Sequence, residues 1–182
     1  MSNGIKVKKR NGRGTEALNL EKMHKMVDEA TQGLAGVSAS QVEIQSGIQF
    51  YDGITTAEIQ EILIKSASDL IDLDHPNYQF VAARLLLFSI RKSLYGRSRE
   101  LPKLEDHIVK CVTQEVYDGD IYSKYSKEDI EKANGYIDHN RDFLFTYAGL
   151  RQVADKYLVQ DRSTGQVYET PQFMYMMIAL TI

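Results

Sequence analysis

Helical periodicity, interrupted by recognisable start and stop residues, is the feature that most restricts the fold of this chain. Apolar residues recur every three or four positions in segments that begin near residues 20, 40, 55 and 76. Thr55 and Glu58 have the spacing of a capping box, and so do Ser40 and Glu43. Gly96 follows the last of these segments, as a helix-ending glycine does. These signals predict four helices in the first half of the chain.

A short β-hairpin is predicted ahead of the first helix, in the stretch VKKRNGRGTEALNLEKMHK that begins at residue 7. Residues 5–9 alternate apolar and polar side chains, and Asn11-Gly12 is a strong tight-turn signal. Residues 15–18 would form the returning strand, after which Asn19 can cap a helix that starts at Leu20. The expected fold class is therefore mainly α, with a small β-hairpin on a four-helix bundle.

Charge is distributed unevenly along the chain. Residues 1–25 carry seven Lys or Arg and two Glu, a local charge of +5, whereas the remainder carries −8. An overall pI near 5.8 argues against binding nucleic acid through a broad basic face. No apolar run is long enough to cross a membrane, and a single cysteine fits the reducing cytoplasm. The basic segment is therefore expected to bind a small anion.

A polar segment, GRSRELPK at residues 96–103, separates the predicted bundle from a second region. We expect a first domain at 1–96 and a second at 97–182. The second region predicts helices at about 103–116, 127–137 and 140–158, a hairpin turning at Thr164-Gly165, and a helix at 171–182.

The last predicted helix, PQFMYMMIALTI, is almost wholly apolar and must be buried. We therefore expect the chain to be either a fragment of a longer subunit or one half of a subunit that is encoded in two pieces. In the second case the missing half would cover Phe173, Met174, Met177 and Ile178. Asp106, Asp138 and Asp142 are expected to be helix-end and surface charges, and Cys111 is expected to be a packing residue. The four histidines lack metal-ligand spacing, so no metal site is predicted.

The predicted hairpin and the following helix bring together groups that bind phosphate. Lys9 and Arg10 supply positive charge, and the helix start from Asn19 to Lys22 supplies free N–H groups at the positive end of a helix dipole. Phe88 and Lys92 share one helix face, so that a base and a phosphate would both find a partner. The alternative is that these cations are solvated and bind nothing, as most charge clusters are.

The segments VKKRNGRGTEALNLEKMHK, IQFYDGITTAEIQEILIKSASDLI, PNYQFVAARLLLFSIRKSLYG and YLVQDRSTGQVYETPQFMY occur here in this order. Together they resemble the N-terminal part of the large (alpha, R1) subunit of class I aerobic ribonucleoside-diphosphate reductase. The resemblance covers essentially the whole chain. It implies an ATP-cone, an allosteric nucleotide-binding domain, followed by the start of the helical region that precedes the catalytic barrel.

The resemblance also implies a set of nucleotide-binding residues. By position these are Lys9, Glu16, Ala17, Leu18, Asn19, Leu20, Glu21, Lys22, Thr56 and Lys92, with Val7, Arg10 and Phe88 close by. Gln60 stands where several relatives have a histidine facing the nucleotide, which leaves the balance between ATP activation and dATP inhibition open. The implied effectors are ATP and dATP, with Mg²⁺ accompanying the nucleotide and no covalently bound cofactor.

The chemistry of the implied reductase needs three cysteines, and this sequence has one. We therefore expect no catalytic residues here and no activity from this chain alone. The implied partners are the remaining catalytic part of the large subunit, a second large subunit and the small radical-generating subunit, without nucleic acid or membrane. Two alternatives remain open. One is a stand-alone nucleotide-sensing module, for instance a cone attached to a transcriptional repressor, which would need zinc-ribbon cysteines that this sequence lacks. The other is a helical interaction module without a ligand.

Overall fold

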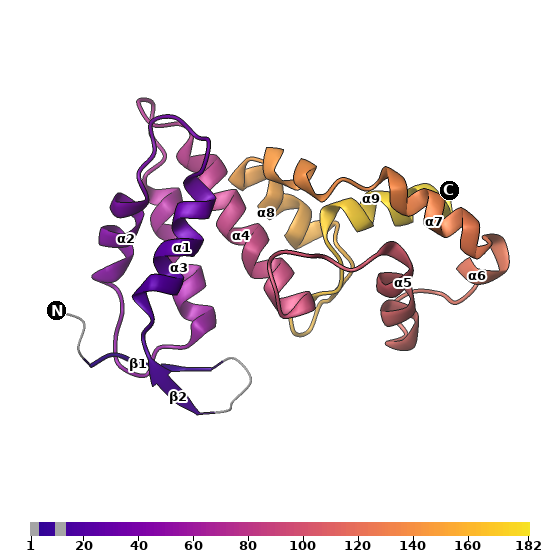
Figure 1. The fold of residues 1–182 in the computed structure, drawn as a ribbon, viewed down its shortest axis with the longest axis horizontal. Coiled ribbons are helices and arrows are strands. Elements are labelled where there is room, and N and C mark those ends of the chain that lie inside the picture. The colour runs from indigo at the N-terminus through magenta and orange to yellow at the C-terminus, as the bar shows by residue number, and fades with distance from the viewer. Residues whose placement is uncertain (1–3, 10–13) are drawn as a thin grey trace. The chain divides into compact units, whose positions relative to one another are not determined.

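The computed structural model describes residues 4–9 and 14–182 (Figure 1). They form two compact units. The first contains the described residues up to Ser89 together with Phe145–Leu150, and the second contains Ile90–Leu144 and Arg151–Ile182. Within the described ranges, no helix combines the length and the apolar character that crossing a bilayer requires.

The predicted hairpin is present in the first unit. Strand β1 (Lys6–Lys8) pairs antiparallel with β2 (Thr15–Ala17), and Val7 lies opposite Glu16. The loop before the third helix runs along the other side of β1, where Gly53 N–H donates to the Lys6 carbonyl (2.8 Å). The hairpin lies at the end of the bundle where α1 and α3 begin (Figure 1). The predicted Asn11-Gly12 turn lies outside the described residues.

Four helices follow the hairpin, as the sequence predicts: α1 (Leu20–Thr31), α2 (Ala39–Gly47), α3 (Thr56–Asp69) and α4 (Tyr78–Tyr95). They bury an apolar core because each presents one apolar face to the others. This core includes Val27, Ala30, Val42, Leu63, Ile64, Ala67, Val81 and Leu85. The expected fold class, a mainly α chain with a small hairpin, is confirmed.

The two predicted capping boxes have different outcomes. Thr55 and Glu58 form theirs at the start of α3, with Thr55 Oγ1 accepting from Glu58 N–H (3.1 Å) and Glu58 Oε2 accepting from Thr55 N–H (2.8 Å). The prediction of a capping box at Ser40 is wrong. The backbone of Ser38 is extended (φ −136°, ψ 123°), so Ser38 is the N-cap of α2 and Ser40 already lies inside the helix.

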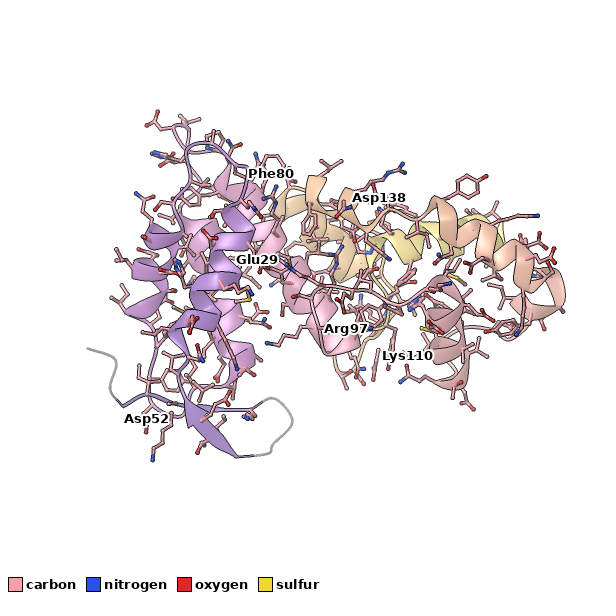
Figure 2. All side chains as sticks on the ribbon, in the orientation of Figure 1. Glu29, Asp52, Phe80, Arg97, Lys110 and Asp138 are labelled. Carbon is pink, nitrogen blue, oxygen red and sulfur yellow. The ribbon has the colours of Figure 1, made fainter. Side chains whose placement is uncertain are left out.

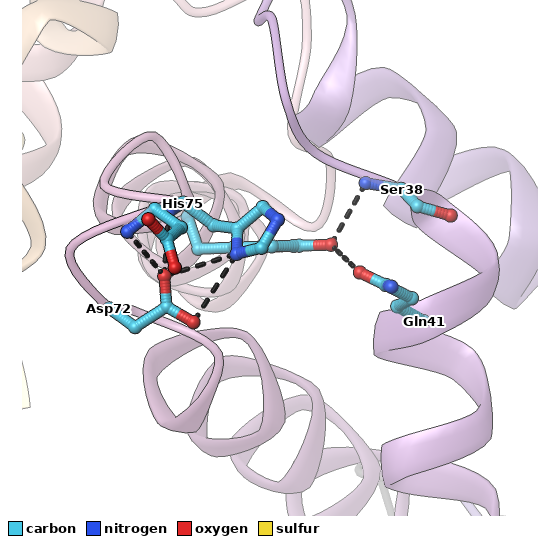
Figure 3. A network of polar contacts seen from close by, with 6 residues as sticks. Ser38, Gln41, Asp72 and His75 are labelled. Atoms are coloured by element: carbon cyan, nitrogen blue, oxygen red, sulfur yellow. Dashed lines mark hydrogen bonds and ion pairs between the residues drawn. The ribbon is translucent and has the colours of Figure 1, made fainter.

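Tyr78, the first residue of α4, links the start of that helix to α2. Its buried hydroxyl accepts from the Ser38 N–H (3.0 Å) and donates to Gln41 Oε1, at the start of α2 (Ser38 and Gln41 are labelled in Figure 3). In the loop just before α4, the Asp72 carboxylate accepts from the His75 N–H (2.6 Å) and contacts its ring. These contacts hold the α3–α4 loop and the start of α2 in one place.

The second unit contains the end of α4 and a series of short elements. These are α5 (Leu104–Thr113), α6 (Ile121–Lys124), α7 (Lys127–Tyr136), the 3₁₀ helix η1 (His139–Leu144), the C-terminal part of α8 (Tyr147–Lys156), β3 (Gln160–Asp161), β4 (Gln166–Val167) and α9 (Pro171–Thr181). The predicted hairpin around Gly165 is present as β3 and β4, and Gly165 has the positive φ of a tight turn (72°).

The single helix expected at 140–158 is wrong, because the chain forms η1 and then α8. Thr146 separates them: its Oγ1 accepts from the Gly149 N–H (3.2 Å), which is the bond of an N-cap. A new helix therefore starts where the periodicity alone predicts a continuous one.

One face of helix α9 is already buried within the second unit. Phe173 and Met177 join a core with Leu104 and Ile108 of α5 and Ile130 of α7. The expectation that Phe173, Met174 and Met177 need a further segment to cover them is therefore wrong, because α5 and α7 supply part of that cover. Ile178 remains 46% exposed.

Candidate functional site

Lys9 and Glu16 form an ion pair across the hairpin. Because Val7 lies opposite Glu16 and side chains alternate along a strand, Val7, Lys9 and Glu16 share one face of the hairpin. Val7 is buried on that face, and Lys9 Nζ lies 3.0 Å from Glu16 Oε2. The two side chains are 42% and 44% exposed, and exposed pairs contribute little stability. Lys9 can therefore exchange its carboxylate partner for a phosphate at low cost.

The start of α1 offers a second group of donors. Asn19 is the N-cap, with its Oδ1 accepting from the Lys22 N–H (2.8 Å), as predicted. The N–H groups of a first helical turn lack partners within the helix and lie at the positive end of its dipole. Lys22 adds an exposed ammonium group in this turn. This helix start is therefore suited to an anion.

An open depression of about 860 Å³ lies against the hairpin and the start of α1. Six of the predicted nucleotide-binding residues line it: Glu16, Ala17, Leu18, Asn19, Leu20 and Glu21. Its other lining residues come from the beginning of β1 and β2, at Gly4–Lys6 and Thr15. The predicted residues Val7, Lys9, Lys22, Thr56, Phe88 and Lys92 are outside this lining. The depression therefore gathers the consecutive residues from Glu16 to Glu21 and leaves the rest of the predicted site elsewhere.

Thr56 approaches the hairpin through the loop that precedes α3. Asp52 accepts from the Lys6 N–H through Oδ1 (2.8 Å; Asp52 is labelled in Figure 2), and Lys8 N–H donates to the Ile54 carbonyl (2.9 Å). Thr56 is the first residue of α3, directly after the Thr55 that bridges to Lys8. The structure thus brings the backbone before Thr56 alongside β1, over a separation of more than 40 residues.

Phe88 and Lys92 occupy successive turns of α4. Phe88 is buried and Lys92 is exposed. The first compact unit ends at Ser89, so Phe88 belongs to the unit that holds the hairpin, whereas Lys92 belongs to the second. Arg10, also predicted to lie near the ligand, is outside the described residues. The placement of Lys92 and Arg10 at the nucleotide therefore stays a prediction.

Gln60 connects three helices inside the first unit. Its side chain is buried on α3, with Nε2 3.8 Å from Met26 Sδ on α1. Its Oε1 accepts from Ser89 Oγ on α4 (3.1 Å). A change at position 60 would therefore alter contacts between α1, α3 and α4 as well as any contact with a ligand.

The second unit holds a buried chain of polar side chains. His107 lies between two tyrosine hydroxyls, with Nδ1 3.2 Å from Tyr95 and Nε2 3.0 Å from Tyr117, and Tyr117 donates to Glu169. Burial lowers the pKa of His107 to about 4 and raises the pKa of Glu169. Cys111 is buried beside His107, as expected of a packing residue, and burial raises its pKa to about 11.

These polar groups do not form a metal site. Among the residues that the structure describes, no group of three or more His, Cys, Asp or Glu side chains is placed to hold a metal ion. Glu169 Oε1 accepts from the Val159 N–H (2.8 Å) while its other oxygen accepts from Tyr117, so this carboxyl group is used in packing the unit.

Asp142 is the residue whose environment the sequence misses most clearly. It was expected at the surface, and it is 1% exposed in an ion pair with Arg91, which is 4% exposed. The expectation is wrong because its partner comes from α4, 51 residues earlier in the chain, where no local signal reveals it. Burial raises the pKa of Asp142, and its hydrogen bond to Arg91 opposes that rise.

Comparison with known proteins gives two family matches. The family described as the ATP cone domain matches residues 5–93, and the family described as the ribonucleotide reductase all-alpha domain matches residues 143–182. The similarity thus continues beyond the residues that match the ATP cone.

Several curated proteins are similar over nearly the whole chain. Ribonucleoside-diphosphate reductase 1 subunit alpha of Escherichia coli is 48% identical over 98% of this chain and 23% of its own length. The subunit alpha of Haemophilus influenzae is 45% identical over 100% of this chain and 24% of its own length, and that of Enterobacteria phage T4 is 42% identical over 92% and 22%. The chain spans about a quarter of the length of these relatives.

Proposed function

Since the chain belongs to the family of ribonucleoside-diphosphate reductase alpha subunits, in its N-terminal region, we propose that it binds ATP and dATP as alternative allosteric effectors of that enzyme. The strongest support comes from three features that lie close together in the sequence. The exposed Lys9–Glu16 pair, the open depression and the capped start of α1 lie within one short stretch of chain.

The proposed site takes its phosphate-binding groups from both ends of that stretch. The triphosphate replaces Glu16 as the partner of Lys9 and accepts hydrogen bonds from the start of α1, where Lys22 adds charge. Thr56 and Lys92 complete the contacts, with Val7, Arg10 and Phe88 nearby. Mg²⁺ accompanies the nucleotide and no covalently bound cofactor takes part.

The two effectors differ by one 2′-hydroxyl group, which sets a limit on direct discrimination. One hydrogen bond contributes about 1 kcal/mol net, so neither nucleotide is strongly rejected. Their opposite effects must then come from a shift between two arrangements of the protein that bind them unequally. Gln60, which contacts Met26 and Ser89 from the adjacent helices, is placed to influence that shift.

For the whole protein, we propose the reduction of ribonucleoside diphosphates to deoxyribonucleoside diphosphates in the cytoplasm. Residues 1–96 form the regulatory domain, and residues 97–182 begin the helical region before the catalytic barrel. The catalytic cysteines lie in the remaining part of the large subunit, because Cys111 is a single buried packing residue. The other proposed partners are a second large subunit and the small radical-generating subunit.

Calorimetric titration of this chain with ATP, dATP and CTP in the presence of Mg²⁺ tests the proposal. We expect saturable binding of ATP and dATP with affinities within about a hundredfold of each other, since one hydroxyl distinguishes them. CTP, which has the same triphosphate and a smaller base, is the matched control and should bind more weakly. Folded protein that binds neither adenine nucleotide at millimolar concentration would contradict the proposal.

A further inference from the structure

Helix α4 carries a buried ion pair next to the residue proposed to bind phosphate. Arg91 is buried and pairs with Asp142, whereas Lys92, the next residue, is exposed. The two partners of the pair also lie close to where the chain passes between the compact units. Arg91 follows the passage after Ser89, and Asp142 precedes the passage after Leu144.

The guanidinium group of Arg91 makes several contacts with η1. Nη2 donates to Asp142 Oδ2 (3.0 Å) and to the carbonyl of His139 (2.7 Å). The group also lies over the ring of Phe143, 5.1 Å from its centre. A buried pair with these contacts fixes the geometry of both segments, because breaking it would leave a charge without a partner away from water.

Contacts with α5 hold the rest of the last turn of α4. Lys110 (labelled in Figure 2) donates through Nζ to the carbonyl of Leu94 (2.6 Å), which satisfies a carbonyl group at the helix end. The same ammonium lies 5.1 Å from the centre of the Tyr95 ring, and the Tyr95 hydroxyl lies 3.2 Å from His107 Nδ1. The turn that presents Lys92 is therefore held by η1 on one side and by α5 on the other.

The hydrogen bonds of Arg91 can also be rearranged. Among the described residues, Arg91 Nε is buried without a hydrogen-bond partner, which is costly in a folded protein. A small rotation of the last turn of α4 would change which nitrogen atoms of Arg91 meet Asp142 and the His139 carbonyl. If a phosphate draws the backbone at Lys92 toward it, this turn moves with Lys92, because Arg91 and Lys92 are adjacent on one helix.

We infer that Arg91 and Asp142 are positioning residues that couple nucleotide occupancy at Lys92 to the arrangement of η1 in the second unit. The inference rests on the proposed function, since it assumes that Lys92 contacts the nucleotide. Coupling between two sites is reciprocal: if the nucleotide stabilises the contact of Arg91 with η1, weakening that contact must weaken nucleotide binding.

Amide hydrogen exchange of the unmodified chain, with and without saturating ATP, gives the first test. When ATP is bound, we expect the amides of η1, residues 139–144, to exchange at least about fivefold more slowly. Fivefold is the lower end of ordinary coupling between sites. Residues 127–136 of α7 serve as the internal control. They belong to the same unit, and the contacts of Arg91 given above are with η1 and not with α7. Unchanged exchange throughout η1 would overturn the inference.

The variant Asp142→Asn gives the second test, because it keeps the shape of the side chain and removes its charge. Its affinity for ATP should fall by about fivefold or more. Asp129→Asn is the matched control: it weakens the capping box of α7 in the same unit and should leave the affinity within about twofold. Equal ATP affinity in Asp142→Asn and the unmodified chain would overturn the inference. If Asp142→Asn does not fold, the exchange measurement decides alone.

The results separate this inference from the proposed function. Failure of the unmodified chain to bind ATP would remove the proposed function, and the inference with it. Normal ATP binding combined with unchanged exchange in η1 and full affinity in Asp142→Asn would overturn the inference alone. Lys92→Ala should lose both the affinity and the protection of η1, and retention of both in that variant would also overturn the coupling through α4.

Discussion

Lys9 Nζ lies 3.0 Å from Glu16 Oε2, and both side chains remain accessible to solvent on the hairpin. Lys9 therefore has a negatively charged partner, as it would have in a phosphate, and the pair stays exposed to solvent. Because a surface pair contributes only about 0–1 kcal/mol, a triphosphate that offers several charged oxygens can replace Glu16 readily.

Replacing Lys9 with alanine should weaken ATP binding. A hydrogen bond to a charged group contributes about 1.5–3 kcal/mol, so the affinity should fall roughly tenfold to a hundredfold in a calorimetric titration. Lys65→Ala is the matched control, since it removes an exposed lysine from α3 that lies outside the proposed site. A similar loss of affinity in both variants would mean that overall charge, rather than a contact of Lys9, attracts the nucleotide.

The N-cap of α1 should contribute measurable stability. Asn19→Ala removes the bond to the Lys22 N–H, so the free energy of unfolding should fall by about 1 kcal/mol in urea titrations followed by circular dichroism. Ser38→Ala, at the N-cap of α2, removes a side chain that makes no capping bond and should cost less. The assignment of Asn19 as a stabilising cap would be wrong if the two variants were equally stable.

The buried His107 should make the stability of the chain depend on pH. Burial holds its pKa at about 4 in the folded protein, below its ordinary value of 6.5. As the pH falls below 6.5, the unfolded chain takes up a proton that folded His107 does not, so the free energy of unfolding decreases until the pH approaches 4. Above 6.5 the contribution of the neutral imidazole is fully present.

Comparison with His107→Gln isolates this effect from other titrating groups, including Glu169 and Asp142. The difference in stability between the unmodified chain and the variant should be constant above pH 6.5 and should shrink toward pH 4. Urea titrations at a series of pH values measure it. Parallel stability profiles for the two proteins would show that His107 titrates equally in the folded and unfolded states.

Cys111 should be nearly unreactive in the folded protein. It is fully buried, and burial raises its pKa from 9.0 to about 11, which reduces the thiolate fraction at neutral pH roughly a hundredfold. A thiol-reactive dye should therefore modify Cys111 at least that much more slowly than it modifies the unfolded chain in denaturant. Rapid modification of folded protein would indicate that the core around α5 opens frequently.

Local signals in the sequence predict most of the first unit. Asn19 caps α1 and Thr55 forms a capping box with Glu58, because each interaction joins residues three positions apart. The Ser40 box fails because Ser38 takes an extended conformation and starts the helix earlier. Thr146 likewise interrupts the helix predicted at 140–158, because its hydroxyl caps a new helix although the apolar periodicity continues across it.

Non-local pairing accounts for what the sequence does not reveal. The resemblance to the reductase family implies Glu16–Glu21 as site residues, and these six residues line one depression, since they are adjacent in the chain. The approach of the loop before Thr56 to β1 depends on backbone bonds between distant segments, such as Lys6 to Asp52. The burial of Asp142 depends in the same way on Arg91, and a charged residue near a helix end gives no sign of such a partner.

Mapping the backbone amide resonances of this chain during titration with ATP tests the central claim most directly. The account predicts the largest shifts at Lys9, across residues 16–22, at Thr56 and at Lys92, all with one dissociation constant. Shifts confined to other surfaces, or no saturable shifts in folded protein, would contradict the claim that this hairpin and the helix start beside it bind the nucleotide.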